Sequence, residues 1–212
     1  MKHCDLSLYL VLDPVLCGGA EGMVDTARIA AQHGVTVVQL RAPQWKKRQW
    51  LDTAQALKAA LDPLGVPLII NDQIDVALAV DAAGVHLGQA DLPPAVARRL
   101  LGPDKLIGLS TSNAVQLAQA PLDLIDYLGV GPVYPTGTKA DASPVIGLPQ
   151  FASLMAARTL PAVGIGGIQA GGAAAVIQAG ADGVAVVSAI CGQPDIAGAV
   201  RALRQEIEGA RP

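Results

Sequence analysis

The stretch Tyr127–Asp141, YLGVGPVYPTGTKAD, consists of an apolar run and a polar loop that follows it directly. The run from Tyr127 to Val133 has the length and composition of a buried strand. The loop that begins at Tyr134 carries two threonines and a lysine, which offer hydroxyl donors and one positive charge to an anion. Pro135 and Gly137 let its backbone turn closely around a ligand. The alternative is an exposed turn without function, and the ends of the other strands decide between the two.

Seven further apolar runs recur along the chain, and stretches rich in Ala and Leu separate most of them. The eight predicted strands are 8–13, 36–41, 67–71, 84–88, 106–110, 127–133, 161–166 and 183–188. The predicted helices are 20–33, 45–61, 73–80, 94–101, 113–118, 149–157, 170–178 and 195–208. This alternation predicts an α/β protein with a parallel sheet. Eight strands that are each followed by a helix favour a closed TIM (β/α)8 barrel over an open doubly wound sheet.

The length and composition agree with this fold. A chain of 212 residues lies within the size range of a barrel that is one domain, so we expect a single domain over residues 1–212. Hydrophobic residues make up 51% of the chain and aromatic residues only 3%, which suits parallel strands buried on both faces. Three glycines that follow predicted helices, Gly34, Gly84 and Gly180, are expected to adopt left-handed conformations at helix ends.

Charge and cysteine content narrow the class of protein. The net charge is −3 and the basic residues are scattered, so we expect no nucleic-acid or membrane partner. No apolar run reaches membrane-spanning length and the N-terminus lacks a secretory signal pattern, which makes the cytoplasm the expected location. The three cysteines, Cys4, Cys17 and Cys191, fit neither a disulfide framework nor a zinc site, and we expect free, partly buried thiols.

In such a barrel the active site lies at the carboxyl ends of the strands, so only polar residues there are candidates. The second predicted strand ends in Gln39 and Arg41, which period-two alternation places on the same side of the sheet. The Arg41 guanidinium suits a phosphate or pyrophosphate because its planar fork bonds two oxygens at once. The alternative is an arginine that closes the strand end by bridging to a neighbouring carboxylate.

Carboxylates follow the third and fourth predicted strands. Asn71 and Asp72 end one strand, and Asp91 lies shortly after the other. Side chains at the ends of consecutive parallel strands converge, and two carboxylates with water and ligand phosphate are a usual Mg²⁺ site. The alternative is that Asp72 and Asp91 are N-caps of the helices that follow.

The fourth and fifth strands carry further polar residues. His86 lies inside an apolar strand, where a structural hydrogen-bonding role is favoured over a general base. Ser110 is followed by Thr111, Ser112 and Asn113. Ser112 or Asn113 is the expected N-cap of the next helix, which leaves Ser110 to point inward.

The last two strands end in small residues. The seventh is followed by Gly166 and Gly167 and the eighth by Ser188, so backbone N–H groups can approach an anion closely. Loops at these two positions of a barrel frequently bind phosphate, often with a short extra helix after the last strand. A tight glycine turn without a ligand is the alternative.

Five motifs together resemble those of the thiamine-phosphate synthase family, over nearly the whole chain and in the family's order. They are Gln39-Leu40-Arg41, Ile70-Asn71-Asp72, Gly84 to Asp91, Gly131 to Lys139 and Val163 to Ile168. The resemblance implies a TIM barrel that couples hydroxymethylpyrimidine pyrophosphate with thiazole phosphate, giving thiamine phosphate and pyrophosphate, with Mg²⁺ as cofactor. It also suggests a homodimer.

The resemblance implies a role for each residue in these motifs. Mg²⁺ would be bound by Asp72 and Asp91. Catalytic roles at the leaving pyrophosphate would fall to Arg41, Ser110 and Lys139. The implied substrate contacts are Gln39 for the pyrimidine, Arg41, Asn71, Ser110 and Lys139 for the pyrophosphate, and Thr136, Thr138, Gly166, Gly167 and Ser188 for the thiazole phosphate.

Two departures from the family pattern stand out. The family usually follows the arginine with an acidic residue and a lysine, and Ala42 and Pro43 occupy those positions here. Our hypothesis is that a basic residue from the nearby run Lys46–Arg48 replaces the missing charge. The family also often carries a histidine two residues after Ser110, where this chain has Ser112.

Three other functions remain open at this stage. The loss of the lysine favours a catalytically degenerate paralogue that binds thiamine precursors as a regulator or carrier. A thiazole tautomerase-like barrel is disfavoured because that enzyme relies on a histidine in the Ser112 region. Another phosphate-binding isomerase or lyase would need an acid/base pair, for which only Asp72 is available as a base.

Overall fold

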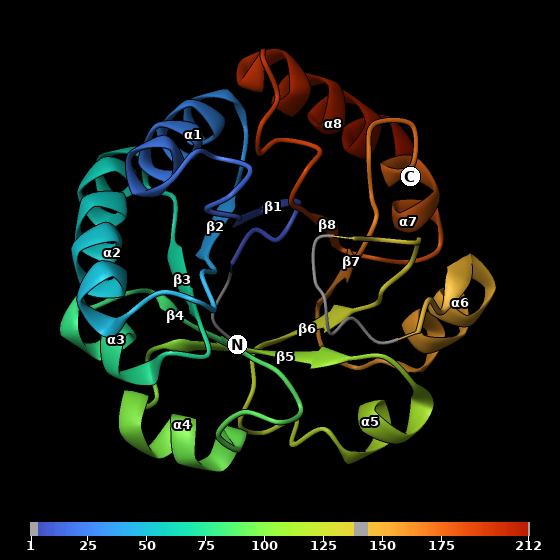
Figure 1. Cartoon of the computed structure of the whole chain (residues 1–212). Coiled ribbons are helices and arrows are strands. Elements are labelled where there is room, and N and C mark those ends of the chain that lie inside the picture. The colour runs from blue at the N-terminus through green and yellow to red at the C-terminus, as the bar shows by residue number, and fades with distance from the viewer. Residues whose placement is uncertain (1–3, 138–143, 212) are drawn as a thin grey trace.

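The computed structural model describes residues 4–137 and 144–211. Within these residues eight parallel strands close into a barrel, and each strand is followed by a helix on the outside (Figure 1). The strands are β1 (Leu8–Leu12), β2 (Val37–Leu40), β3 (Leu68–Asn71), β4 (Gly84–Leu87), β5 (Leu106–Thr111), β6 (Tyr127–Val130), β7 (Ala162–Ile165) and β8 (Gly183–Val186). The helices are α1 (Ala20–His33), α2 (Lys47–Leu61), the 3₁₀ turn η1 (Asp62–Leu64), α3 (Ile74–Ala79), α4 (Pro94–Leu101), α5 (Ala114–Gln119), α6 (Gly147–Ala157), α7 (Ala173–Gln178) and α8 (Ile196–Ala210). The predicted TIM barrel is confirmed.

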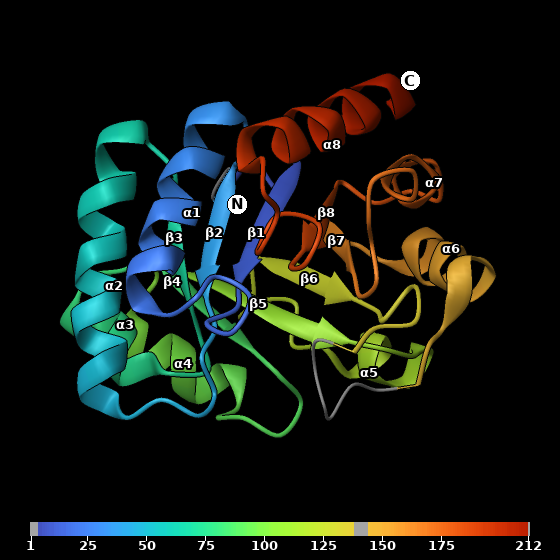
Figure 2. The ribbon, with the colours of Figure 1, turned by 45° about the horizontal axis from the view of Figure 1, so that its top comes forward.

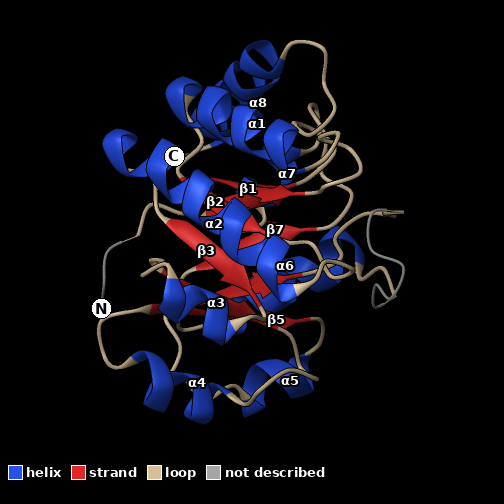
Figure 3. Ribbon diagram, turned by 60° about the vertical axis from the view of Figure 1, so that its left-hand side comes forward, coloured by secondary structure: helices blue, strands red, loops and turns tan. Residues whose placement is uncertain are grey.

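Each strand pairs in parallel with its two neighbours in the chain, and β8 pairs with β1 to close the sheet. Side chains alternate between the two faces of every strand, which divides the core in two. Leu8, Leu10 and Leu12 of β1 pack outward against the helices, as do the matching residues of the other strands. Tyr9 and Val11 point into the barrel, where they pack with apolar side chains from β2, β3, β5, β6, β7 and β8. Figure 3 shows the strands enclosed between helices in a side view.

The helix ends confirm two of the three predicted left-handed glycines. Gly34 ends α1 with φ 124° and Gly180 follows α7 with φ 102°. The prediction for Gly84 is wrong, since this residue begins β4, where a Cβ would lie 2.0 Å from the Leu106 carbonyl oxygen. Asp81 adopts the left-handed conformation instead, with φ 51°. Gly84 is therefore needed for the close approach of β4 and β5.

Strand β6 ends at Val130, three residues earlier than predicted. Pro132 has no N–H to donate to a neighbouring strand, so regular pairing stops there. The chain still follows β7, because the amides of Val133 and Tyr134 donate to the carbonyls of Ile165 (2.9 Å) and Gly166 (3.0 Å). These bonds hold the start of the β6–α6 loop against the end of β7. Figure 2 shows the loops after β5, β6 and β7 at the same end of the barrel.

Of the helices in the described residues, none combines the length and apolar character needed to cross a membrane.

Candidate active site

The barrel places most of the predicted site residues at the carboxyl ends of its strands. Gln39, Asn71 and Ser110 lie within the last two residues of β2, β3 and β5. Arg41, Asp72, Asp91, Thr136, Gly166, Gly167 and Ser188 lie in the loops that follow the strands. Thr138 and Lys139 lie outside the described residues, so their predicted roles are not examined by the structure.

A chain of hydrogen bonds crosses the barrel interior. Gln39 Nε2 donates to the hydroxyl of Tyr9 at 2.8 Å, and this hydroxyl lies 2.8 Å from that of Tyr127. The Tyr127 hydroxyl lies 3.1 Å from Nδ1 of His86, and Nε2 of the same ring lies 2.9 Å from Ser110 Oγ. Five strands, β2, β1, β6, β4 and β5, thus contribute one residue each to a single chain.

The numbers of donor hydrogens on these side chains fix the direction in which the hydrogen bonds run, from Gln39 to Ser110. The Gln39 amide nitrogen only donates, so Tyr9 uses its one hydrogen toward Tyr127, which donates in turn to Nδ1 of His86. The imidazole then carries its proton on Nε2 and donates to Ser110 Oγ. In this arrangement Ser110 Oγ accepts from the imidazole, so its own hydrogen is left to donate to another acceptor. His86 is accordingly a structural hydrogen-bonder, as predicted.

The space for these rings comes from two glycines. A Cβ on Gly108 would lie 2.2 Å from Cζ of Tyr127 and 2.5 Å from Nδ1 of His86. A Cβ on Gly129 would lie 3.0 Å from Cε1 of the same imidazole. Both phenols are fully buried, and burial raises the pKa of Tyr9 and of Tyr127 above that of an ordinary tyrosine. They therefore stay neutral and act as hydrogen-bonding groups.

Tyr9 and Tyr127 were not among the site residues predicted from the sequence. Both occupy inward-facing positions, as the packing of Tyr9 with Tyr127 at 5.9 Å between ring centroids shows. The chain contains only three tyrosines, and two of them, Tyr9 and Tyr127, fall within the first two residues of predicted strands. A tyrosine in an otherwise aliphatic strand is the sequence signal from which a buried hydrogen-bonding role could have been predicted.

The two predicted metal ligands lie on neighbouring strand ends. The Asp72 amide donates to the carbonyl of His86 in β4, and Asp72 Oδ2 accepts from Asn71 Nδ2 at 2.6 Å. Asp91 Oδ2 accepts from the amide of Gly88, directly after β4, at 2.7 Å. The alternative role as helix caps is wrong, because α3 and α4 begin after Gln73 and Pro93.

These carboxylates fit a hard cation. Asp72 has φ 59°, a left-handed conformation that is uncommon outside glycine and clusters at functional sites. In the described part of the chain no group of three or more His, Cys, Asp or Glu side chains could hold a metal. A Mg²⁺ ion that keeps several waters and binds ligand phosphate needs only one or two carboxylates, so this pair is compatible with such an ion.

The basic residues after β2 differ in their partners. Arg41 is partly buried and pairs with no carboxylate within residues 4–137 and 144–211, so the alternative of a structural ion pair is not observed there. Lys47 Nζ lies 2.7 Å from Asp75 Oδ1 and also bonds Gln73, while Arg48 pairs with Asp52.

These pairings reduce the number of basic residues in the run Lys46–Arg48 that could replace the missing lysine. Lys47 and Arg48 each already bind a carboxylate. Lys46 precedes α2, its side chain is exposed, and it pairs with no carboxylate of the described residues. Of the three basic residues, Lys46 is the one that can turn toward a ligand without giving up a carboxylate of that set.

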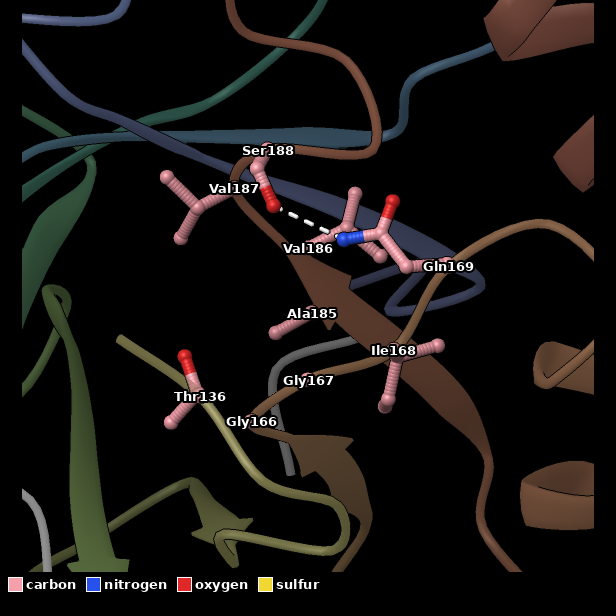
Figure 4. A pocket seen from close by; sticks show the side chains of 9 residues that line it. All are labelled: Thr136, Gly166, Gly167, Ile168, Gln169, Ala185, Val186, Val187 and Ser188. Carbon is pink, nitrogen blue, oxygen red and sulfur yellow. Dashed lines mark hydrogen bonds between the residues drawn. The ribbon is translucent and has the colours of Figure 1, made fainter. Parts of the chain in front are cut away.

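A small cavity lies between the ends of β7 and β8 (Figure 4). It is lined by Thr136, Gly166, Gly167, Ile168, Gln169, Ala185, Val186, Val187 and Ser188. Thr136 lies next to the glycine pair, Ser188 lies across the cavity from it, and Gln169 Nε2 donates to Ser188 Oγ at 2.7 Å. The side-chain and backbone donors around this cavity suit a phosphate.

Both glycines of this cavity are required by their surroundings. Gly166 has φ 96° and Gly167 has φ 68°. A Cβ would lie 2.4 Å from Pro132 Cβ in the first case and 2.4 Å from the Pro135 carbonyl oxygen in the second. The glycine pair thus packs directly under the loop that carries Thr136.

The loops after β5 and β8 carry Asn113, Ser112 and Ser188. Asn113 caps α5, since its Oδ1 accepts from the Gln116 amide at 2.9 Å, and this prediction is confirmed. Ser112 bonds the side chain of Gln116. Ser188 lies in a turn after β8, in which the Cys191 amide donates to the Val187 carbonyl at 2.8 Å.

A family model, curated relatives and a solved structure that are similar to this chain all carry the name of one family. The model of a family described as thiamine monophosphate synthase matches residues 8–190. A thiamine-phosphate synthase of Laribacter hongkongensis is 59% identical over 202 residues, which cover 95% of each chain. Another, of Azorhizobium caulinodans, is 52% identical over 207 residues, covering 98% of this chain and 97% of that one. The solved structure of a thiamine phosphate pyrophosphorylase from Pyrococcus furiosus matches with a TM-score of 0.88 at 33% identity and covers 98% of each chain.

Proposed function

Because the chain belongs to the thiamine monophosphate synthase family and is a transferase of thiamine biosynthesis, we propose that it couples hydroxymethylpyrimidine pyrophosphate with thiazole phosphate in a Mg²⁺-dependent reaction. One observation carries the assignment of substrates. The carboxylate pair at β3 and β4 and the glycine-lined cavity at β7 and β8 share one end of the barrel, as two phosphorylated substrates that must meet require.

The reaction breaks the bond between the pyrimidine methylene carbon and the pyrophosphate oxygen. The cation that remains is stabilised by the aminopyrimidine, and the thiazole nitrogen then forms the new C–N bond. No protein nucleophile is needed, so the work of the protein is to stabilise leaving charge and to align two rings.

Charge stabilisation is assigned to the side of the barrel that carries Arg41. Its guanidinium, which has no carboxylate partner in the described residues, would bond the pyrophosphate together with Asn71 and Lys139. Ser110 would donate its hydroxyl hydrogen, since the imidazole of His86 already supplies the bond that its oxygen accepts. Asp72 and Asp91 would hold Mg²⁺, which neutralises part of the pyrophosphate charge when it is bound.

Alignment of the pyrimidine is assigned to Gln39. Its Nε2 donates one hydrogen to the Tyr9 hydroxyl, which orients the amide, and the amide oxygen is the group that can accept from an amino substituent. The thiazole phosphate would lie at the glycine cavity, against Thr136, Thr138, Gly166, Gly167 and Ser188.

Two finer assignments also belong to this proposal. A homodimer is proposed from the family resemblance, and sedimentation of the purified protein tests it. A cytoplasmic location is proposed from the phosphorylated substrates, which do not cross membranes unaided, and cell fractionation tests it.

The test is one incubation of the purified protein with both precursors, with and without Mg²⁺, in which thiamine phosphate and pyrophosphate are measured. We expect equimolar products that depend on the metal. Binding of both precursors without product would instead support the degenerate paralogue that the loss of the lysine at Pro43 suggested. Product formation at an equal rate without metal would overturn the roles of Asp72 and Asp91.

A further inference from the structure

Two cysteines meet where the barrel closes. Cys17 lies in the loop between β1 and α1, and Cys191 lies in the turn after β8. Strands β1 and β8 are paired neighbours, which brings these loops together at the carboxyl end of the barrel (Figure 1). A Cβ on Gly192 would lie 3.1 Å from the Leu16 carbonyl oxygen, so the residues next to the two cysteines are in contact.

The two thiols lie close enough to interact with each other, and both interact with the backbone of Asp13. Cys191 is buried, and its thiol also donates to the Val11 carbonyl at 3.6 Å. Cys17 is only partly buried, so part of this residue is open to solvent. The pair thus combines one partly exposed cysteine with one buried cysteine.

The two sulfurs differ in acidity. The interaction with the Cys191 thiol lowers the pKa of Cys17, and the Thr26 hydroxyl and the Asp13 amide add to this effect. The same contact and burial raise the pKa of Cys191 above that of an ordinary thiol. Burial raises the pKa of Cys4 to about 11, and this third thiol is an internal reference.

We propose that Cys17 and Cys191 form a peroxide-reactive dithiol that closes to a reversible disulfide. The Cys17 thiolate attacks one oxygen of hydrogen peroxide, the O–O bond breaks, and after protonation water leaves with Cys17 as a sulfenic acid. The Cys191 sulfur then attacks the Cys17 sulfur, the S–O bond breaks, and a second water leaves. Two thiols are oxidised and one peroxide is reduced.

The crosslink has a structural consequence at the carboxyl end of the barrel. It would join the β1–α1 loop to the turn 187–192, which carries Ser188 on the wall of the glycine cavity. This modification requires neither thiamine precursor, so it holds or fails independently of the proposed substrates.

Peptide mapping of the wild-type protein tests the proposal without any substitution. After treatment with hydrogen peroxide, we expect a Cys17–Cys191 linked peptide, a mass decrease of about 2 Da and full recovery with dithiothreitol. Alkylation should then label only Cys4. Peroxide treatment that leaves all three cysteines alkylatable, or that oxidises Cys4 as fast as the pair, would overturn the proposal.

Two variants assign the roles within the pair. Cys17→Ser should show no peroxide-dependent loss of the Cys191 thiol, whereas Cys191→Ala should accumulate a sulfenic acid at Cys17 that dimedone traps. Cys4→Ser is the matched control and should form the disulfide at the wild-type rate. Equal reaction of Cys191 with peroxide in Cys17→Ser would contradict the assignment of Cys17 as the attacking thiol.

Hydrogen exchange tests the structural consequence. Peptides that cover the turn 187–192 should exchange more slowly in the oxidised protein than in the reduced one. Unchanged exchange there would refute the link between the disulfide and the Ser188 turn.

Discussion

Nε2 of His86 lies 2.9 Å from Oγ of Ser110, so an imidazole held inside the barrel orients a hydroxyl at its carboxyl end. The ring is itself fixed by the Tyr127 hydroxyl at Nδ1. The orientation of the Ser110 side chain therefore depends on a residue to which no substrate contact is assigned, and this dependence can be measured.

The substitution His86→Leu should lower both stability and activity. It leaves the Ser110 and Tyr127 hydroxyls without this partner, and each buried unsatisfied group costs about 1–3 kcal/mol. We expect a loss of about 2–4 kcal/mol in the free energy of unfolding by urea, with a higher KM for the pyrimidine pyrophosphate. His33→Leu, in which the lost bond is to the Ile29 carbonyl of a surface helix, is the control. Equal effects of the two substitutions would contradict the role of His86.

The buried tyrosines should make the protein sensitive to alkali. The pKa of Tyr127 is raised by burial well above its ordinary value of 10.0, so this phenol stays neutral in the folded state while it ionises in the unfolded chain. The stabilisation is complete below pH 10 and is lost as the pH rises above it, by about 1.4 kcal/mol per pH unit for each such tyrosine. Urea unfolding between pH 9 and about 11 measures the slope. Tyr127→Phe should flatten it more than Tyr134→Phe, whose phenol is only partly buried.

The metal assignment predicts a specific change in Mg²⁺ dependence. Asp72→Asn or Asp91→Asn should raise the Mg²⁺ concentration for half-maximal activity by about tenfold or more, because one of two charged ligands is lost. Asp75→Asn is a matched control, since Asp75 lies close in sequence but pairs with Lys47. Mg²⁺ titrations of the three variants that coincide with the wild type would remove Asp72 and Asp91 from the site.

The missing lysine of the family pattern should be replaced by Lys46 and not by Lys47. Lys46→Ala is expected to raise the KM for the pyrimidine pyrophosphate about fivefold, the effect of about 1 kcal/mol. Lys47→Ala should leave kinetics unchanged and cost at most about 1 kcal/mol of stability, because its exposed pair with Asp75 contributes little. A Lys46→Ala/Lys47→Ala double variant with wild-type turnover and pyrophosphate affinity would show that neither lysine compensates.

The glycine cavity can be probed by adding one methyl group. Gly166→Ala would place a Cβ 2.4 Å from Pro132 Cβ, so the loop that carries Thr136 must shift. We expect KM for thiazole phosphate to rise about tenfold or more, because tightly packed backbone cannot relax cheaply. Gly171→Ala is the control, since Gly171 also has a positive φ of 88° but no atom lies within 4 Å of its added Cβ. Similar kinetics for the two variants would assign the effect to backbone strain alone.

The sequence predicted the elements well because periodicity and breakers are local signals. The observed bounds of α1 and α4 equal the predicted ones, and every strand was found, with ends that differ by a few residues. Errors arose where a local signal had a nonlocal cause. Gly84 resembles a helix cap in sequence, but it is glycine because Leu106 of the adjacent strand lies too close for a Cβ.

The site residues likewise divide into those that local sequence signals predict and those whose role depends on distant strands. The rule that polar residues at strand ends face one region placed Arg41, Asp72 and Ser110 correctly at the carboxyl end of the barrel. It missed Tyr9 and Tyr127, which lie at the amino-terminal parts of β1 and β6. Their role depends on hydroxyl groups of distant strands meeting inside the barrel, and no spacing along the chain encodes that meeting.

The sequence by itself thus determined eight βα units, a parallel barrel and the chemical types of groups at its mouth, because alternation and strand ends are properties of neighbouring residues. Only the tertiary structure decided which groups contact each other. It joined Gln39 to Ser110 through three buried side chains, bound Lys47 and Arg48 to carboxylates, and brought Cys17 against Cys191. Closure of the sheet is the physical reason, since the pairing of β8 with β1 makes the first and last loops of the barrel neighbours.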